Sequence, residues 1–263
     1  MNKNYIIPNE WAIVEEGFDV ENVEASESLF SIGNGSMGQR ANFEEDYSGK
    51  TFQGSYIGGI YYPDKTRVGW WKNGYPEYFA KVLNAPNWIG IGVRINGKTL
   101  DLNSCKVIDF SRELDMRNGV LTRSFIAEFE DGDLVKVNTS RFLSLDIQEV
   151  GAINYSVTPI NFQGEIEFSP YLDAGIINED SNYDEFFWEI LEQKETDEEA
   201  YILSKTLKTG FHVCTGMKVE LFLNDYNIDV EKKVKSTDKS ISYSYATKVN
   251  SGDTFTIIKY GGY

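Results

Sequence analysis

The feature that most constrains this chain is a long series of alternating apolar and polar residues, which begins near residue 88 and continues to residue 260. A period of two places alternate side chains on opposite faces of a β-strand. The runs are separated by turn-forming pairs such as Asn96-Gly97 and Asp131-Gly132. Alternating runs joined by such turns predict antiparallel sheets.

The number of these runs indicates how the sheets are arranged. Alternating runs occupy residues 88–95, 120–129, 134–143, 151–158, 165–168, 200–203, 211–214, 217–223, 240–246 and 253–260. A first strand near residues 11–18 and a glycine-rich strand over 54–60 precede them. With more than ten strands, two packed sheets are favoured over one open sheet. The predicted fold class is all-β, a large two-sheet antiparallel β-sandwich with at most one or two short helices.

One stretch departs from this pattern. Residues 180–199 contain apolar residues at helical spacing, followed by an acidic run over 195–199; the apolar residues are Tyr183, Phe186, Phe187 and Ile190. We expect either one short helix or a long acidic crossover here, and we interpret the acidic run as a solvated surface.

Composition limits the classes of function. Hydrophobic residues make up 41% of the 263 residues, enough for a sizeable core, and we expect a single domain over residues 1–263. The net charge of −16 argues against nucleic acid or an anionic membrane as partner. Only two cysteines, Cys105 and Cys214, fit a reducing compartment better than a disulfide framework, although one long-range bridge remains an alternative. With no signal peptide or long apolar segment, we expect a cytoplasmic protein.

The first candidate functional segment follows a short apolar run over residues 29–32, which predicts a buried strand. The Gly-Asn-Gly sequence behind it predicts a turn, and a polar cluster comes next. In one interpretation this is a tight hairpin whose Arg40 pairs with the neighbouring Glu44 and Glu45. In the other, the loop presents Asn34, Arg40 and Glu44 to a polar ligand or to a neighbouring domain.

The second candidate segment is aromatic and interrupted by Gly and Pro. Trp70, Trp71, Tyr75, Tyr78 and Trp88 belong to it. Flat apolar rings stack on sugar faces, but such rings equally pack against a partner domain or cap a sandwich. Both interpretations stay open on the residues alone.

The sequence does not supply the residues for several kinds of chemistry. The single histidine, His212, lies among apolar residues in a predicted strand, so no nucleophilic triad can be assembled. No cluster of ligands has the spacing of a metal site, and no nucleotide-binding motif occurs. Carboxylates are abundant, but no pair stands out as the acid and base of a glycosidase. We expect no metal and no organic cofactor.

Residues 27–45, from Glu-Ser-Leu-Phe-Ser-Ile-Gly-Asn-Gly-Ser-Met-Gly-Gln-Arg to Asn-Phe-Glu-Glu, resemble the opening signature of glycoside hydrolase family 65. That family contains maltose, kojibiose, nigerose and trehalose phosphorylases. Further segments resemble the same family in the same order, at residues 74–88, 112–123, 140–145 and 158–161, continuing to Leu172, Asp173 and Asn178. The Trp-Trp-Lys-Asn-Gly-Tyr-Pro sequence at 70–76 favours the maltose enzymes within the family.

The resemblance implies a galactose-mutarotase-like sandwich that forms the N-terminal domain of an inverting phosphorylase. In the family, a helical linker and an (α/α)6 barrel follow, and the barrel carries the general-acid glutamate and the phosphate site. We therefore expect the parent enzyme to be a homodimer that acts on a disaccharide and phosphate. We expect this chain alone to be inactive, with no catalytic residue of its own, and to support the barrel.

In this interpretation the substrate-proximal or interdomain candidates are Asn34, Arg40, Glu44, Trp70, Trp71 and Tyr75. The chain ends in a strand that finishes with Gly-Gly-Tyr, and we expect a longer protein to continue from there. Two other functions remain as alternatives. One is a stand-alone carbohydrate-binding sandwich, which the aromatic segment would explain. The other is a mutarotase-like enzyme, which needs a histidine and a carboxylate in one groove.

Overall fold

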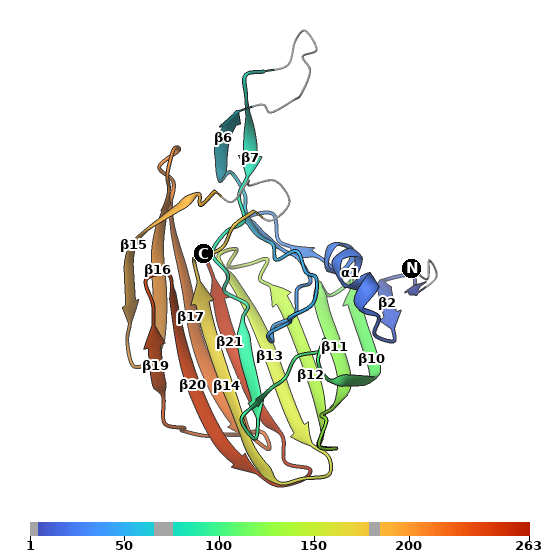
Figure 1. Cartoon of the computed structure of the whole chain (residues 1–263). Coiled ribbons are helices and arrows are strands. Elements are labelled where there is room, and N and C mark those ends of the chain that lie inside the picture. Colours follow the sequence, from blue (N-terminus) through green and yellow to red (C-terminus); the bar gives the residue numbers. More distant parts are fainter. Residues whose placement is uncertain (1–4, 66–75, 179–184) are drawn as a thin grey trace.

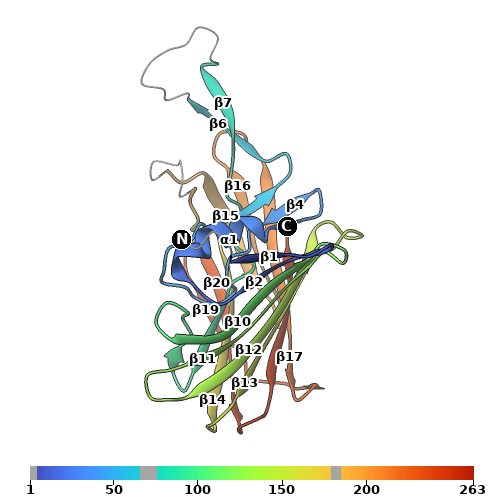
Figure 2. The same ribbon diagram turned by 90° about the vertical axis from the view of Figure 1, so that its right-hand side faces the viewer.

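The computed structural model describes residues 5–65, 76–178 and 185–263. Its main body is a sandwich of a large antiparallel sheet and a smaller antiparallel sheet that lies across one face of it (Figure 1). Turned by 90°, the same body is seen closer to edge-on, with a two-stranded arm extending from one end (Figure 2). The predicted all-β, two-sheet antiparallel class is confirmed.

The large sheet has 11 strands. Their order across the sheet is β1 (Ile6–Pro8), β2 (Ala12–Glu16), β10 (Lys106–Asp115), β11 (Val120–Glu128), β12 (Leu134–Leu143), β13 (Val150–Pro159), β21 (Phe255–Gly262), β17 (His212–Leu223), β16 (Glu199–Thr206) and β15 (Trp188–Glu195), with β18 (Tyr226–Asn227) paired to β17. The last strand in the sequence, β21, therefore lies between β13 and β17 in the middle of the sheet.

The second sheet has five strands, in the order β19 (Lys233–Ser236), β20 (Ser240–Val249), β14 (Gly164–Asp173), β8 (Ile91–Ile95) and β9 (Lys98–Thr99). Two small sheets complete the described strands: β3 (Ile32–Gly33), β4 (Met37–Gln39) and β5 (Ser55–Ile57) form one, and β6 (Tyr61–Lys65) and β7 (Tyr78–Val82) form the other. In the described ranges, the helices are the short 3-10 helix η1 (Val20–Asn22) and α1 (Val23–Leu29).

The alternation in the sequence places the core between the two sheets. In β12, Val135 and Val137 are fully buried, whereas Lys136 and Asn138 on the other face are exposed. The inner faces of both sheets share one continuous apolar core. Trp88 lies in this core, where Gly151 leaves room for it: a Cβ at that glycine would come 2.6 Å from the indole.

The predicted turns also form. Asn96 and Gly97 have φ angles of 50° and 78° between β8 and β9, as a type I′ hairpin turn requires. Gly132 has a φ of 86° at the turn between β11 and β12. The turn chemistry therefore sets the strand pairing as the sequence predicts.

A buried lysine links the two sheets. Lys259, on β21 of the large sheet, donates hydrogen bonds to the carbonyl oxygens of Gly90 and Tyr171, each at 2.8 Å. Tyr171 lies on β14 and Gly90 just before β8, both in the small sheet. Burial lowers the pKa of Lys259 well below its usual value, because the charged form loses its water.

Two sequence predictions were wrong. Residues 29–32 do not form one strand, because Leu29 ends α1 with half of its surface exposed and only Ile32 enters β3. A short apolar run does not distinguish a helix end from a strand. In the segment expected to be a short helix or an acidic crossover, residues 180–184 lie outside the described residues, and Trp188–Glu195 form edge strand β15. Trp188 packs inward while its acidic neighbours remain in solvent. Acidic side chains on an edge strand discourage further pairing.

Other predictions concern the cysteines, the histidine and membrane spans. Both cysteines are free, Cys105 half-buried and Cys214 exposed. His212 begins β17 with its side chain exposed. No helix among the described residues is long and apolar enough to cross a membrane.

Candidate functional site

Asn34 fastens the glycine-rich hairpin formed by β3 and β4. Its side-chain oxygen accepts hydrogen bonds from the backbone N–H groups of Ser36 and Met37, at 3.1 and 2.9 Å. Its side-chain nitrogen donates to the carbonyl oxygens of Ser144 and Gln148, at 2.7 and 2.9 Å. The side chain is therefore committed to joining the hairpin to the loop between β12 and β13.

Arg40 lies just past the hairpin and bridges it to other segments. Its Nε atom donates to the carbonyl oxygen of Phe52 at 2.8 Å, and an Nη atom donates to the carbonyl oxygen of Glu24 at 3.2 Å. Its ion-pair partner is Glu27, at 3.8 Å. The expected pairing of Arg40 with Glu44 and Glu45 is therefore wrong. Arg40 also borders a hollow of about 450 Å³ beside α1.

Glu44 and Glu45 instead meet arginines from the inner face of the large sheet. Arg123 on β11 binds both carboxylate oxygens of Glu45 at 2.5 Å and one oxygen of Glu44 at 2.8 Å. Arg141 on β12 lies 3.2 Å from the other Glu44 oxygen. All four side chains are at most 4% exposed. Two acidic residues of the loop are thus neutralised by two strands of the sheet.

A third arginine extends this buried cluster, which we call the arginine clamp: Arg112, Arg123 and Arg141 with Glu15, Glu44 and Glu45. Arg112 lies directly opposite Arg123 in the pairing of β10 with β11. Like charges in that position repel, and the Glu15 carboxylate 3.2 Å from Arg112 offsets the repulsion. Both guanidinium groups lie close to the Phe43 ring, 5.1 and 4.5 Å from its centroid.

The charges of the arginine clamp determine what it can do chemically. Burial alone would raise the pKa of Glu44, but Arg141 and Arg123 outweigh it and hold that pKa below the usual value. Burial raises the pKa of Glu15 and lowers the pKa of Arg112 to about 10. Arginine does not exchange protons near neutral pH, so a Glu44 carboxylate held by arginines is suited to anchoring the loop rather than to general-acid catalysis.

The arm formed by β6 and β7 projects from the same end of the sandwich as the C-terminal residue (Figure 1). It exposes apolar side chains, with Tyr78 52%, Phe79 44% and Val82 58% exposed. At its base, Lys81 forms a buried ion pair with Asp64 at 2.7 Å. The arm therefore combines a fixed base with an apolar surface that the described residues leave uncovered.

A glycine-lined hollow of about 450 Å³ lies where the arm meets the hairpin. Gly35 and Gly59 have φ angles of 94° and 81°, which favour glycine. A Cβ at Gly58 would come 3.2 Å from the Ser36 carbonyl oxygen. Glycines of the hairpin and of residues 54–60 thus let two turns approach closely at the base of the arm.

The structure brings the sequence candidates together only in part. Asn34 and Arg40 brace the hairpin, and Glu44 lies in the arginine clamp. Trp70, Trp71 and Tyr75 lie outside the described residues. The described ranges contain no group of three or more His, Cys, Asp or Glu side chains that could hold a metal ion.

Sequence reasoning missed the arginines of the clamp as a unit. A signal was present, because Arg123 shares the inward face of β11 with Leu121 and Phe125. A charged residue at a core position needs a buried partner, and the paired glutamates at 44 and 45 supply it. The alternation pattern located the arginine, but the partner lay 78 residues away.

Comparison with known proteins shows which protein family the sequence matches. Residues 13–263 match the family described as glycosyl hydrolase family 65, N-terminal domain. The chain is 40% identical over 252 residues to maltose phosphorylase of Bacillus subtilis, covering 95% of this chain and 33% of that protein. It is 28% identical to kojibiose phosphorylase of Thermoanaerobacter brockii, covering 83% of this chain and 27% of that protein. It is 27% identical to alpha,alpha-trehalose phosphorylase of the same organism, covering 99% of this chain and 35% of that protein.

A solved structure has the same fold. It is a putative kojibiose phosphorylase from human microbiome, with a TM-score of 0.86 and 26% identity over 100% of this chain and 33% of that one. The chain thus spans about a third of the length of the relatives that it matches.

Proposed function

Because the chain belongs to the N-terminal domain family of glycosyl hydrolase family 65, we propose that it acts as a non-catalytic domain within a disaccharide phosphorylase. The proposed reaction of the parent enzyme is phosphorolysis of maltose to glucose and β-glucose 1-phosphate. The 40% identity to a maltose phosphorylase, against 28% and 27% to kojibiose and trehalose enzymes, supports maltose as the substrate.

The observation that carries the supporting role is the uncovered arm. Tyr78, Phe79 and Val82 are each about half exposed on one short hairpin. Concentrated apolar exposure of this kind marks a surface that another protein surface covers. The chain covers 33% of the maltose phosphorylase that it resembles, so that relative has further sequence in the same polypeptide. We assign the contact to the catalytic barrel, near the end that binds sugar.

The buried polar contacts of the domain serve rigidity in this proposal. Asn34 fixes the hairpin that lies beside the base of the arm, and the arginine clamp anchors the loop that follows the hairpin. Catalysis by inversion needs one acid and an attacking phosphate, which takes the place of the base-activated water of an inverting hydrolase. We place both in the remainder of the parent enzyme. The two free cysteines support a reducing, cytoplasmic compartment.

The direct test is phosphorolysis. The 263-residue chain and a full-length parent protein that contains it are each incubated with maltose and inorganic phosphate, and released glucose is measured. We expect activity only from the longer protein. Turnover by the 263-residue chain alone would reject the non-catalytic assignment.

The arm is tested with Phe79→Ser in both proteins, beside Tyr226→Ser as a control at a 78% exposed position on β18. In the full-length protein, we expect the arm variant to lower phosphorolysis or the thermal midpoint, and the control to leave both unchanged. In the 263-residue chain, neither variant should change the free energy of unfolding by more than about 0.5 kcal/mol. Equal behaviour of the two full-length variants would refute the docking role of the arm.

A further inference from the structure

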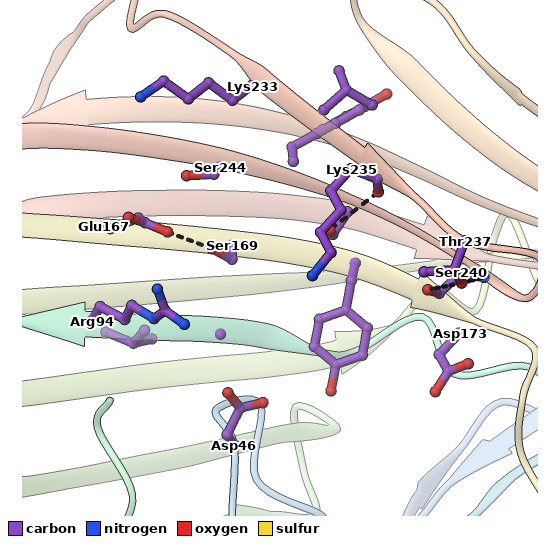
Figure 3. A pocket seen from close by; sticks show the side chains of 16 residues that line it. Asp46, Arg94, Glu167, Ser169, Asp173, Lys233, Lys235, Thr237, Ser240 and Ser244 are labelled. Atoms are coloured by element: carbon purple, nitrogen blue, oxygen red, sulfur yellow. Dashed lines mark hydrogen bonds between the residues drawn. The ribbon is translucent and has the colours of Figure 1, made fainter. Parts of the chain in front are cut away.

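The outer face of the five-stranded sheet contains a hollow of about 420 Å³ (Figure 3). Its floor is made of small residues from three adjacent strands: Gly92 on β8, Ser169 on β14, and Ser242 and Ser244 on β20. Gly92 pairs with Ser169 in the register of β8 and β14. Small side chains at neighbouring outward positions leave a depression in a sheet face, and the volume is in the range of small-molecule sites.

Three cations surround this floor: Arg94, Lys233 and Lys235. In the described part of the chain, none of them forms an ion pair within 4.0 Å. Three carboxylates, Asp46, Glu167 and Asp173, line the same hollow. The hollow therefore presents charged groups of both signs, which suits a ligand that has an anionic part and hydrogen-bond donors.

The side chains of two of these cations point into the hollow. Figure 3 shows Arg94 and Lys235 extending toward the middle of the hollow from opposite sides, with Ser169 on the floor between them. Guanidinium and ammonium groups are the usual partners of a phosphate group. The Ser169 hydroxyl already donates to the Glu167 carboxylate at 3.1 Å, so the two cations are the phosphate donors in this arrangement. Both cations are exposed, so a ligand reaches them without displacing protein groups.

The opposite margin of the hollow offers different contacts. Asp46 and Asp173 border it (Figure 3), and Tyr171 also lines the hollow. Burial raises the pKa of Tyr171 above its usual value, with further contributions from Asp46 and Asp173, so its hydroxyl remains a donor at neutral pH. Carboxylates accept hydrogen bonds from sugar hydroxyls, and an aromatic ring packs against apolar sugar faces.

We propose that this hollow is a binding site for a phosphorylated sugar, with the phosphate held by Arg94 and Lys235 and the sugar hydroxyls by Asp46 and Asp173. A bare anion would be repelled by the carboxylates at one margin, and a neutral sugar would leave the cations unmatched. A ligand with a phosphate at one end and hydroxyls at the other satisfies both margins. The hollow shares no residue with the arm or with the glycine-lined hollow at its base.

The test is isothermal titration of the 263-residue chain at low ionic strength, where screening of exposed charges is weakest. The probes are glucose 1-phosphate and glucose 6-phosphate, beside glucose alone and inorganic phosphate alone. We expect at least one sugar phosphate to bind at least tenfold more tightly than either glucose or inorganic phosphate. Equal binding of inorganic phosphate, equal binding of glucose, or no heat with any sugar phosphate would overturn the proposal.

The location is tested by three charge-removing variants at exposed positions: Arg94→Gln, Lys235→Gln and the control Lys136→Gln on the large sheet. Loss of one charge-assisted hydrogen bond should weaken the sugar phosphate by about tenfold or more. The control should bind as the unaltered chain does, and circular dichroism should be unchanged in all three. Unchanged affinity in both hollow variants would overturn the location. The titration needs no phosphorolysis, so its failure would leave the proposed function standing.

Discussion

Arg123→Met should be among the most destabilising single changes in this chain. Arg123 binds Glu45 through both carboxylate oxygens and Glu44 through one. Without it, Glu44 keeps Arg141 at 3.2 Å, but Glu45 loses the only ion pair found for it among the described residues. Breaking a buried ion pair from one side costs about 3–5 kcal/mol, because a charge is left unpaired. Arg141→Met leaves Glu44 paired, so we expect a smaller loss of roughly 1–3 kcal/mol.

The measurement is the free energy of unfolding from urea denaturation, with Lys106→Ala as control. Lys106 is 70% exposed in its pair with Glu128, and its loss should change the free energy of unfolding by no more than about 0.5 kcal/mol. The double variant Arg123→Met with Glu45→Leu removes the unpaired charge and should recover part of the loss. Arg123→Met should also cost less at pH 5 than at pH 7.5, since a lone buried carboxylate can then take up a proton.

Three results would refute this reasoning about the arginine clamp. The first is a loss below about 1 kcal/mol for Arg123→Met, comparable to a surface substitution. The second is a double variant no more stable than the single variant. The third is a larger cost at the lower pH.

Three further predictions concern the hairpin and the sheets. Asn34→Ala should cost roughly 1–3 kcal/mol of unfolding free energy, and it should accelerate hydrogen exchange in the β3–β4 hairpin, because four hydrogen bonds are lost. Burial lowers the pKa of Lys259 well below its unfolded value of about 10.4, so the unfolded chain binds more protons at pH values between the two pKa values. The unaltered chain should therefore gain stability relative to Lys259→Met as pH rises from 7 to 10. A difference in unfolding free energy that stays constant with pH would contradict this. Gly90→Ala places a Cβ 2.0 Å from the Tyr171 ring and should lower the free energy of unfolding by about 1–3 kcal/mol. Gly92→Ala meets only ordinary contacts at 3.4 Å or more, so it should lower the free energy of unfolding by less.

The sheets were predictable because their information is local. A run such as residues 134–143 carries its own period, and the Asn96-Gly97 turn carries its own backbone geometry. The end of α1 was not predictable in this way. Leu29 belongs to a helix that buries Val23, Ser26 and Glu27, and only that packing shows which of its residues face inward.

The candidate site was less predictable because its interactions are distant in the sequence. Asn34 bonds to residues 110 and 114 positions away, and Arg123 reaches back 78 positions to Glu45. Residue types predict that such groups need partners, but not which partners they find. The hollow on the small sheet shows the same limit, since Arg94 and Lys235 meet only after β8 and β19 are placed on either side of β14 and β20.

The central place of β21 has a consequence for how the protein forms during synthesis. On a ribosome, β1, β2 and β10 to β13 can pair as one part of the large sheet, and β15 to β17 can form a second part. Within the large sheet the two parts join only through residues 255–262, because β21 hydrogen-bonds to β13 on one side and to β17 on the other. Until then each part presents a long unpaired edge, which is the kind of surface that chaperones bind and that aggregates grow from. Translation beyond β21 thus ends the period in which the nascent chain is most vulnerable.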